Sequence, residues 1–297
     1  MFKLRRISEH PILAPIQEHE WEKTAVLNCG VCYDNGVFHM LYRASDRPFG
    51  DFTQKFVSRF GYAVSTNGVH FTRLDKPVFA EDDPWADWGC EDPRIVKMGD
   101  EYYVTYSTWD GNVQHIRARL ATTRNFMVWH RRGILLDEVN KNVALFAEKI
   151  GGRYVLVHRR ESAIWMCFSD NLTSWTDHRK VMDVRPGKWD SRKIGIAGPP
   201  VKRKDGWFLI YHGVDGARVY RLGGALLDSN DPTEVVARQD EPVLEPALDW
   251  EINGLVPNVV FSCATVDVGD SYYVYYGGGD SMIGLAVIEK DRVSFEQ

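Results

Sequence analysis

The sequence predicts an all-β fold, a five-bladed β-propeller, and three observations lead to that prediction. Five segments of the 297-residue chain read alike, with a Gly or Asp at a turn followed by aromatic and β-branched residues. Such residues favour strands, so each segment is expected to be a strand that follows a turn. The segments recur at intervals of roughly fifty to sixty-five residues, in the range of one propeller blade. No convincing long helix pattern appears beside them.

The five repeated strands each end in a tyrosine or a histidine, here called the anchor residue. They lie in 35–45, 100–111, 151–162, 205–216 and 270–280, with anchor residues Tyr42, Tyr106, His158, Tyr211 and Tyr276. We expect these to be the innermost strands, whose next residues line a shared rim around the channel of the propeller. Those next residues are Arg43, Ser107, Arg159, His212 and Gly277. Two arginines and a histidine that face one cavity indicate an anion site.

A second apolar strand follows each anchor strand. These second strands are expected in 59–65, 115–123, 163–170, 221–228 and 282–289. Three of the five units then show a turn and a closing strand with an aromatic residue, in 67–74, 124–130 and 170–178. Three strands joined by two turns make the meander of a blade. Residues 231–239 could form one short turn of helix.

Residues 1–297 are expected to form a single catalytic domain, because no linker interrupts the repeats. The N-terminal strand should close the ring against the last blade, since closure removes open sheet edges. The alternative is a β-sandwich in which the similarity of the segments arises by chance. Five matched units favour the propeller.

Composition narrows the function classes. The net charge of −5 and the lack of long basic runs argue against nucleic acid as a partner. The apolar runs are too short to span a membrane, and no signal peptide is visible at the N-terminus. Five scattered cysteines are typical of a reduced, cytoplasmic protein. Cys29 and Cys32 form a lone CxxC, the histidines show no clustered spacing, and no metal site is therefore expected.

The segment GCEDPR (89–94) resembles the GxEDPR signature of glycoside hydrolase family 130, the β-mannoside phosphorylases and their hydrolytic relatives. Further segments resemble the same family: 27–31, 41–45, 58–71, 191–201, 206–214, 224–228, 256–261 and 275–280. The combination is specific, although EDPR alone would be a weak signal, and it covers nearly the whole chain. The family is known as a five-bladed propeller, in agreement with the repeats.

The resemblance implies inverting phosphorolysis of β-mannosides, with Asp92 as the general acid. Its proton is expected to reach the glycosidic oxygen through the 3-hydroxyl of the mannosyl unit. Inorganic phosphate then attacks C1 from the opposite face and gives α-mannose 1-phosphate. Bond cleavage needs a protonated leaving group and a nucleophile on the other face. Phosphate is already an anionic nucleophile, so the site needs cations to hold it rather than a second carboxylate to activate water.

The resemblance also implies the binding residues. Phosphate is expected to contact Lys193, His212, Arg159 and Arg117, with Arg119 as the alternative to Arg117 because the register of that strand is uncertain. The expected sugar-binding residues are Asn28, Arg43, Arg59 and Asp280. Glu91 is expected to orient the loop through a salt bridge to Arg94 or to an arginine of the site. No cofactor is expected, because inorganic phosphate is the co-substrate.

Three alternatives stay open at this point. A hydrolase of the same family would lack the basic cluster and would need a glutamate base, for which Glu148 and Glu161 are the candidates. Other five-bladed sugar-cleaving families use three carboxylates, whose equivalents are not found here. A non-catalytic carbohydrate-binding propeller would suit the ten tryptophans.

The substrate and the assembly are less defined. The short chain favours β-1,2-mannobiose or short β-mannooligosaccharides, while β-1,4-linked substrates stay possible. The expected partners are a β-mannoside and phosphate, with no nucleic acid or membrane, and the protein is expected to be a monomer or a homodimer. The loop residues Trp85, Trp88, Trp109 and Trp189 flank the expected site and could stack on sugar or pack the loops.

Overall fold

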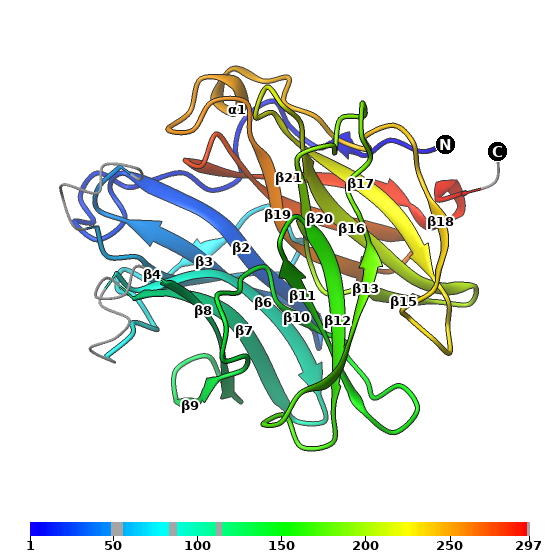
Figure 1. The fold of residues 1–297 in the computed structure, drawn as a ribbon. Helices are drawn as coiled ribbons and strands as arrows, with labels where there is room; N and C mark the ends of the chain where they lie inside the picture. Colours follow the sequence, from blue (N-terminus) through cyan, green and yellow to red (C-terminus); the bar gives the residue numbers. More distant parts are fainter. Residues whose placement is uncertain (49–55, 83–87, 111–114, 296–297) are drawn as a thin grey trace.

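Five antiparallel sheets stand in a ring in the computed structural model of the chain (Figure 1), which confirms the predicted five-bladed β-propeller. The structure describes residues 1–48, 56–82, 88–110 and 115–295. Each sheet is one blade, and its strands follow one another outward from the channel in chain order, apart from the closing strand of the last blade.

The first three blades have four strands each. Blade 1 consists of β2 (Ala25–Asp34), β3 (Val37–Ser45), β4 (Arg59–Ser65) and β5 (Thr72–Arg73). Blade 2 consists of β6 (Cys90–Met98), β7 (Glu101–Asp110), β8 (His115–Thr123) and β9 (Trp129–Ile134). Blade 3 consists of β10 (Ala144–Leu145), β11 (Tyr154–Arg160), β12 (Ala163–Ser169) and β13 (Thr176–Met182).

The last two blades complete the ring. Blade 4 consists of β14 (Lys193–Ile196), β16 (Gly206–Val214), β17 (Tyr220–Leu227) and β18 (Val235–Arg238), with β15 (Val201–Arg203) also paired to β16. Blade 5 consists of β19 (Val260–Val268), β20 (Ser271–Gly278), β21 (Met282–Glu289) and β1 (Arg5–Arg6). The helical elements are α1 (Asp249–Ile252) and the 3₁₀ turn η2 (Lys290–Arg292).

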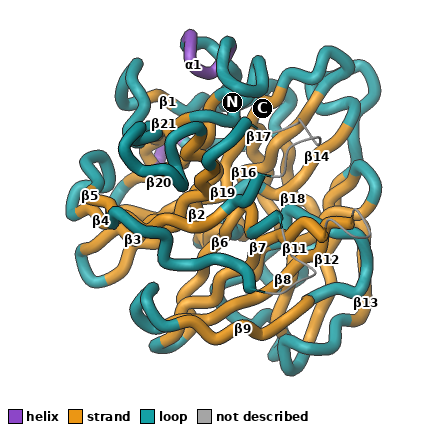
Figure 2. Tube along the Cα trace, turned by 90° about the vertical axis from the view of Figure 1, so that its left-hand side faces the viewer, coloured by secondary structure: helices purple, strands orange, loops and turns teal. Residues whose placement is uncertain are grey.

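The N-terminal strand closes the ring, as predicted. Arg5 of β1 pairs with Val287 of β21, and Arg6 pairs with Ala286, so the first strand of the chain completes the last blade. The two termini consequently lie close together (Figure 2). Pairing the outer edge of the last blade in this way leaves one fewer open edge.

Two details of the strand prediction are wrong. The anchor residues lie on the second strand of each blade, not on the innermost one, because a first strand precedes each of them. These first strands are β2, β6, β10, β14 and β19. In addition, residues 231–239 contain strand β18 instead of a helical turn. The β-branched pair Val235–Val236 at its start explains this preference.

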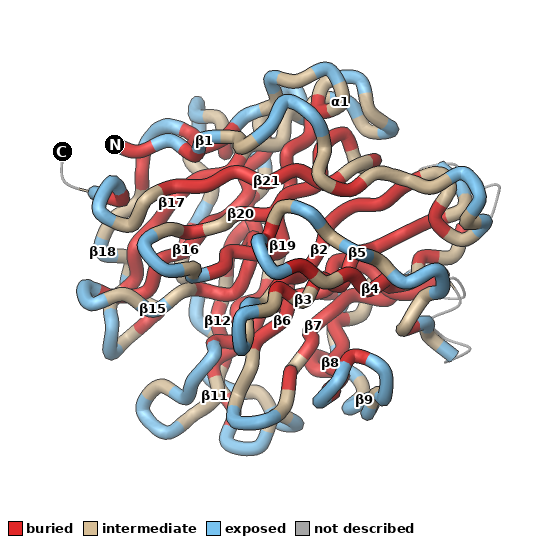
Figure 3. Tube along the Cα trace, turned by 180° about the vertical axis from the view of Figure 1, so that it is seen from behind, coloured by how far each residue is buried: buried red, intermediate tan, exposed pale blue. Residues whose placement is uncertain are grey.

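Apolar clusters fill the spaces between neighbouring blades. Figure 3 shows the buried residues concentrated along the strands inside the molecule, with the exposed residues mainly in the outer loops. In strand β11, successive side chains alternate between two such apolar clusters. Val155 and Val157 pack toward blade 4, whereas Leu156 packs toward blade 2. Successive side chains of a strand point to opposite faces, so His158 faces blade 2 and Arg159 faces the other way.

A buried polar set recurs in four of the five blades. In each, the anchor tyrosine donates a hydrogen bond of 2.5–3.0 Å to a buried carboxylate. That carboxylate also pairs with an arginine of the fourth strand. The sets are Tyr42 with Glu22 and Arg73, Tyr106 with Glu81 and Arg131, Tyr211 with Asp190 and Arg238, and Tyr276 with Glu251 and Arg6. Blade 3 carries His158 instead of the tyrosine.

All five cysteines are free. Among the described residues, no helix has the length and apolar character needed to cross a membrane.

Candidate active site

Irregularities in the first strands turn two polar side chains toward the channel. The register shifts between Leu27 and Gly30 in β2 and between Glu91 and Arg94 in β6. Within these bulges, Asn28 (φ 44°) and Asp92 (φ 52°) adopt the left-handed conformation. Asn and Asp tolerate this conformation better than most residues, and a bulge can re-aim a side chain. The EDP sequence therefore places the Asp92 carboxylate in the channel.

Asn28 and Asp92, with their left-handed backbone, line a single cavity of about 110 Å³. Asn142 (φ 58°) and Asp280 (φ 49°) also adopt the left-handed conformation and line it. The cavity is lined by Asn28, Arg43, Asp92, Lys141, Asn142, Arg159, Lys193, His212, Tyr220, Val256, Val259, Phe261 and Asp280. Seven of the nine residues expected at the site thus meet in one place, and they come from all five blades. Strained conformations clustered in this way are typical of functional sites.

Asp92 sits in a cationic environment. Its Oδ1 accepts a hydrogen bond of 2.8 Å from Nδ2 of Asn28 and lies 3.6 Å from Nη1 of Arg43. Burial alone would raise the pKa of Asp92, but Arg43, Lys141, Arg94 and the Asn28 hydrogen bond together lower it below its usual value. Asp92 is therefore a carboxylate at neutral pH in the ligand-free protein.

Asp280 behaves in the opposite way. Burial raises its pKa to about 6; Arg43 opposes this rise, and the negative charge of Asp92 adds to it. The buried carboxylate of Asp92 and the half-buried one of Asp280 lie near one arginine and cannot both ionise without cost, so their protonation is coupled. Asp280 consequently takes up a proton more readily than Asp92 while the cavity holds no anion.

Three further cations line the cavity: Lys141, Arg159 and Lys193. Lys193 donates a hydrogen bond of 2.6 Å from Nζ to the Tyr220 hydroxyl. Burial and the charges of Arg159, Lys141 and Arg192 lower the pKa of Lys193 to about 8. Burial also lowers the pKa of Arg159. The cations thus destabilise one another, and an anion bound among them would relieve that repulsion.

His212 and Asn142 present unused polar atoms beside these cations. Both residues are buried, and neither the ring nitrogens of His212 nor the amide atoms of Asn142 have a hydrogen-bond partner among the described residues. A Cβ added at Gly195 would lie 2.5 Å from Cε1 of His212 and 3.1 Å from Oδ1 of Asn142, so only glycine leaves this space open. Burial, together with the neighbouring cations, lowers the pKa of His212 well below its usual value and keeps it neutral. A neutral imidazole N–H and an amide can both donate to an oxyanion.

Two further residues hold the acid in place. Glu91 accepts a hydrogen bond of 2.7 Å from Nη2 of Arg43, so its salt bridge goes to an arginine of the cavity, as expected, and not to Arg94. Arg94 is buried and donates to three carbonyls: Ala197 (2.5 Å), Ile196 (3.1 Å) and Asp92 itself (3.0 Å). It therefore links the backbone of the bulge to the first strand of blade 4.

Several expected residues lie elsewhere. Arg59 and Arg117 are not among the described residues that line the cavity, so their assigned contacts stay predictions. Arg119, the alternative to Arg117, is also absent from that lining; its Nε donates to Thr108, and its Nη1 lies 4.0 Å from Glu81. Both Arg117 and Arg119 belong to the third strand of blade 2.

The glutamates considered as hydrolytic bases face solvent. Glu148 is exposed and pairs with Lys202, and Glu161 is exposed in the turn after β11. Neither lines the cavity, whose lining carboxylates among the described residues are Asp92 and Asp280. Of the loop tryptophans, Trp189 stacks on Tyr211 and donates to the Asp240 carbonyl, which favours loop packing. Trp85 lies outside the described residues.

Sequence reasoning missed Lys141, Asn142 and Tyr220. Lys141 and Asn142 precede β10, a first strand of only two residues that shows no apolar pattern. One signal could have found Asn142: it is a short polar residue two positions before β10, and Asn28 and Asp92 are short polar residues near the starts of β2 and β6. A wider cavity of about 560 Å³ adjoins this one and shares the lining residues Lys193, Tyr220 and Val256.

Known proteins with similar sequences share one activity class. Residues 3–294 match the model of glycoside hydrolase family 130, described as β-1,4-mannooligosaccharide phosphorylase. A β-1,2-mannobiose phosphorylase of Thermoanaerobacter sp. (strain X514) is 54% identical over 302 residues, covering 99% of this chain and 100% of the relative. A 1,2-β-oligomannan phosphorylase of the same organism is 50% identical over 297 residues, with the same coverage of both chains.

Solved structures show the same fold in both phosphorylases and hydrolases. β-1,2-Mannobiose phosphorylase from Listeria innocua, in complex with β-1,2-mannobiose, matches with a TM-score of 0.89 at 28% identity, covering 98% of each chain. A second structure matches with a TM-score of 0.89 at 28% identity, covering 100% of this chain and 97% of the other. Its description states that this family of mannoside phosphorylases contains glycoside hydrolases that target β-1,2-mannosidic linkages. The fold alone therefore does not distinguish phosphorolysis from hydrolysis. The distinction has to come from the residues that line the cavity.

Proposed function

Because this chain belongs to glycoside hydrolase family 130, we propose that it is an inverting phosphorylase of β-1,2-mannobiose or short β-1,2-mannooligosaccharides. The linkage is taken from the two full-length relatives, both of which are named for β-1,2-linked substrates. At 50% and 54% identity they weigh more than the β-1,4 description of the family as a whole.

One observation carries the choice of phosphorolysis: the mutually repelling cations around Lys193. Burial and the neighbouring positive charges lower the pKa of Lys193 to about 8. Such an arrangement is costly unless an anion occupies it, and phosphate is the anionic co-substrate of a phosphorylase. Buried polar atoms of His212 and Asn142 without partners among the described residues add hydrogen-bonding capacity for its oxygens.

The proposed reaction divides the cavity between two tasks. Asn28, Arg43 and Asp280 hold the mannosyl unit beside Asp92, while Arg159, Lys193 and His212 hold phosphate, with Lys141 as a further cation. The proton of Asp92 passes to the glycosidic oxygen through the 3-hydroxyl of the mannosyl unit. The C1–O bond to the departing sugar breaks as a phosphate oxygen bonds to C1 from the opposite face. Inversion turns the β-mannoside into α-mannose 1-phosphate.

Asp92 must be protonated before it can act as an acid. Binding of phosphate is expected to favour its protonated form. In the ligand-free protein, Arg43, Lys141 and Arg94 keep Asp92 ionised. A phosphate dianion that neutralises the cluster removes part of this stabilisation and adds negative charge nearby. Both changes raise the pKa of Asp92. Phosphate would therefore have two roles: it is the nucleophile, and its binding promotes protonation of Asp92.

Hydrolysis fits the cavity less well. An inverting hydrolase needs a second carboxylate to activate water on the face opposite the acid. Glu148 and Glu161 are exposed and do not line the cavity. Asp280 interacts electrostatically with Asp92 and Arg43, so the proposal places it beside the acid and not on the opposite face, where the base of an inverting hydrolase is needed. The reaction as proposed uses no cofactor, and we propose a monomer or homodimer as the active form.

The test is an incubation with β-1,2-mannobiose and with β-1,4-mannobiose, each with and without inorganic phosphate. Mannose 1-phosphate is expected from the β-1,2-linked substrate only when phosphate is present. Faster turnover of the β-1,4-linked substrate would overturn the linkage but keep phosphorolysis. Equal release of mannose with and without phosphate would overturn phosphorolysis.

A further inference from the structure

Blade 3 departs from the other blades at three related positions. Blades 1, 2, 4 and 5 carry the buried set of anchor tyrosine, carboxylate and fourth-strand arginine. In each, that arginine pairs across the sheet with a third-strand alanine. The alanines are Ala63, Ala121, Ala225 and Ala286. The corresponding residues of blade 3 are His158, Cys167 and His178, so tyrosine, alanine and arginine are all replaced.

The correspondence follows from strand register. His158 is the anchor of β11 and pairs with Trp165 of β12; Cys167 comes two residues later, on the same face of that strand. In the other blades, too, the alanine comes two residues after the partner of the anchor tyrosine. His178 of β13 lies at a register shift opposite Cys167, between the pairs Met166 with Arg179 and Phe168 with Thr176. This bulge turns His178 toward the cysteine.

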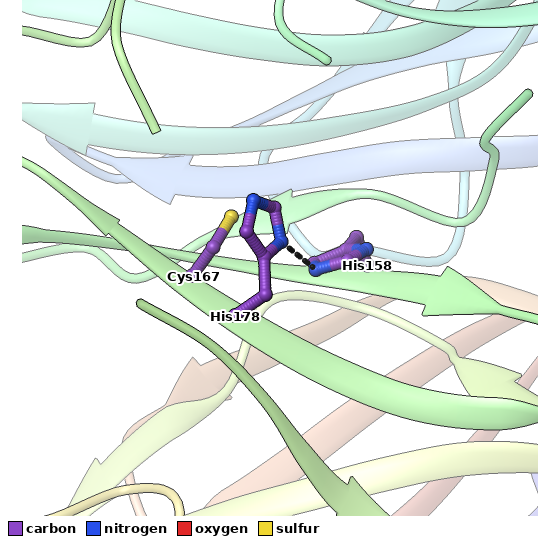
Figure 4. A group of neighbouring side chains, drawn as sticks. All are labelled: His158, Cys167 and His178. Carbon is purple, nitrogen blue, oxygen red and sulfur yellow. Dashed lines mark hydrogen bonds between the residues drawn. The ribbon is translucent and has the colours of Figure 1, made fainter. Parts of the chain in front are cut away.

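The three side chains converge from adjacent strands (Figure 4). One donor atom from each, two imidazole nitrogens and the Cys167 Sγ, lie within 4.8 Å of one another. Nδ1 of His178 is 3.2 Å from Nε2 of His158. Two nitrogens bound to one zinc ion at tetrahedral angles lie roughly 3.3 Å apart, because each Zn–N bond is about 2.0–2.1 Å long. The imidazoles are thus already spaced for a shared ion, and the thiol has to approach by up to roughly 1 Å.

We propose that His158, Cys167 and His178 form a binding site for a Zn²⁺-class transition-metal ion between blades 3 and 2. Two imidazoles and one thiolate are the ligands that such ions prefer. His158 and Cys167 are buried, and His178 is half-buried at the wall of an open cavity of about 460 Å³. That cavity supplies a route for the ion and space for water as a fourth ligand.

Asn140 and Glu138 lie beside the outer ring nitrogen of His158, Nδ1. Without an ion, Asn140 lies 3.0 Å from Nδ1 of His158, and the two histidines share a hydrogen bond. With an ion on Nε2, the proton of His158 sits on Nδ1 instead, so the Nδ2 amide of Asn140, which donates to Nδ1 in the ion-free protein, has to turn away. Oε1 of Glu138, 3.9 Å from that nitrogen, is the acceptor at hand. A carboxylate behind a metal-bound histidine orients the ring and strengthens the bond.

Binding of the ion releases a proton. Burial raises the pKa of Cys167 to about 12, so the residue is a thiol before the ion arrives. Coordination replaces S–H by a sulfur–metal bond, and the proton leaves to solvent. The pKa of His158 is lowered to about 3, mainly by burial, so this ring is neutral and ready to bind across the physiological range.

The ion would stiffen part of the blade that carries active-site residues. His158 precedes Arg159, which lines the catalytic cavity, and Asn140 precedes Lys141 and Asn142, which line it too. An ion that ties β11, β12 and β13 together would restrict these segments. The expected effect of the ion is therefore greater stability of blade 3. The metal proposal does not depend on the proposed enzymatic function.

The experiment is a titration of the metal-free protein with Zn²⁺, followed by isothermal calorimetry, and with Co²⁺, followed by absorption. One equivalent should bind, and Co²⁺ should give a thiolate-to-cobalt charge-transfer band with intense tetrahedral bands. Loss of an outer partner already costs about 10–100-fold in metal affinity, so Cys167→Ala should cost at least about a hundredfold. The control Cys32→Ala removes a cysteine that faces His39 across blade 1 and should bind as the wild type does.

A triple variant guards against simple misfolding. His158→Tyr, Cys167→Ala and His178→Arg together give blade 3 the residues that the other four blades use, so the variant should fold. It should lose both the bound equivalent and the rise in melting temperature that Zn²⁺ causes in the wild type. The proposal is overturned if the wild type binds no stoichiometric Zn²⁺, or if the folded triple variant binds it equally well.

Discussion

Asn28 donates a hydrogen bond of 2.8 Å to Oδ1 of Asp92, although 64 residues separate them in the chain. Both lie at bulges in the first strands of neighbouring blades, and both adopt the left-handed backbone conformation. The bond joins blade 1 to blade 2 inside the cavity proposed as the active site. It also favours the ionised form of Asp92 and so contributes to its lowered pKa.

Asn28→Gly should lower kcat/KM about 10–100-fold. A hydrogen bond to a charged group contributes about 1.5–3 kcal/mol, and about 1.4 kcal/mol corresponds to a factor of ten in rate. Glycine keeps the left-handed backbone without strain, so folding should be little affected. Asn35→Gly is the matched control, because Asn35 has a φ of 49° in an exposed turn. Full activity of Asn28→Gly would remove the bond from the mechanism.

Asp92→Asn should reduce turnover of mannobiose by about 10²–10⁴-fold, the usual contribution of a general acid. An aryl β-mannoside with a good leaving group needs no protonation, so this variant should phosphorolyse it far better than mannobiose. Asp205→Asn, on the surface beside Arg203, is the control and should behave like the wild type. If both substrates suffer equally, Asp92 does not act as the acid.

Lys193→Ala should raise the KM for phosphate more than the KM for the sugar. Because its pKa is lowered to about 8, Lys193 loses its charge as pH rises through that value. In the wild type, the KM for phosphate should therefore increase above pH about 8, by at most about tenfold per pH unit. Lys193→Arg keeps its charge and should abolish this alkaline increase. A pH dependence that is the same in wild type and Lys193→Arg would assign it to another group.

Asp280→Asn should stabilise the phosphate-free protein while it impairs catalysis. The folded-state pKa of Asp280 is about 6, above its ordinary value of 3.8. Folding therefore disfavours the carboxylate, and this group lowers stability progressively as pH rises from about 4 to 6. Above pH 6 the loss amounts to roughly 2–3 kcal/mol, which the neutral variant should regain.

Urea unfolding at pH 5 and pH 7 measures this effect. Asn also tolerates the φ of 49° at position 280. Asp34→Asn is the contrasting control: hydrogen bonds from Lys97 and Tyr102 lower the pKa of Asp34, so that variant should lose stability near neutral pH. An Asp280→Asn variant that is no more stable than the wild type at pH 7 would contradict the assignment of a strained carboxylate.

The repeats reveal the fold in the sequence because each blade uses the same aromatic, β-branched second and third strands. Strand ranges 59–65, 115–123 and 282–289 match β4, β8 and β21. The first strands escape the pattern, because they are interrupted by bulges at Asn28 and Asp92 or shortened to two residues in β10. These irregular strands carry much of the site.

The same irregularity explains what could be predicted of the cavity. Asp92, Lys193, His212 and Arg159 lie in segments that resemble a known family or follow an anchor residue. Lys141 and Asn142 have no such pattern, and they reach the cavity only because tertiary packing directs the segment before β10 inward. The cluster of His158, Cys167 and His178 is hidden for another reason: its members are spread along three strands and meet only through strand pairing.

The central claim is that phosphate, held by the cations of the cavity, is the nucleophile that attacks C1. The most direct test is to follow β-1,2-mannobiose and phosphate with the enzyme by ³¹P and ¹H NMR. The account predicts equal amounts of mannose and α-mannose 1-phosphate from the first turnovers, with no cleavage when phosphate is omitted. Two molecules of mannose per mannobiose with phosphate unconsumed, or β-mannose 1-phosphate as the first product, would contradict it.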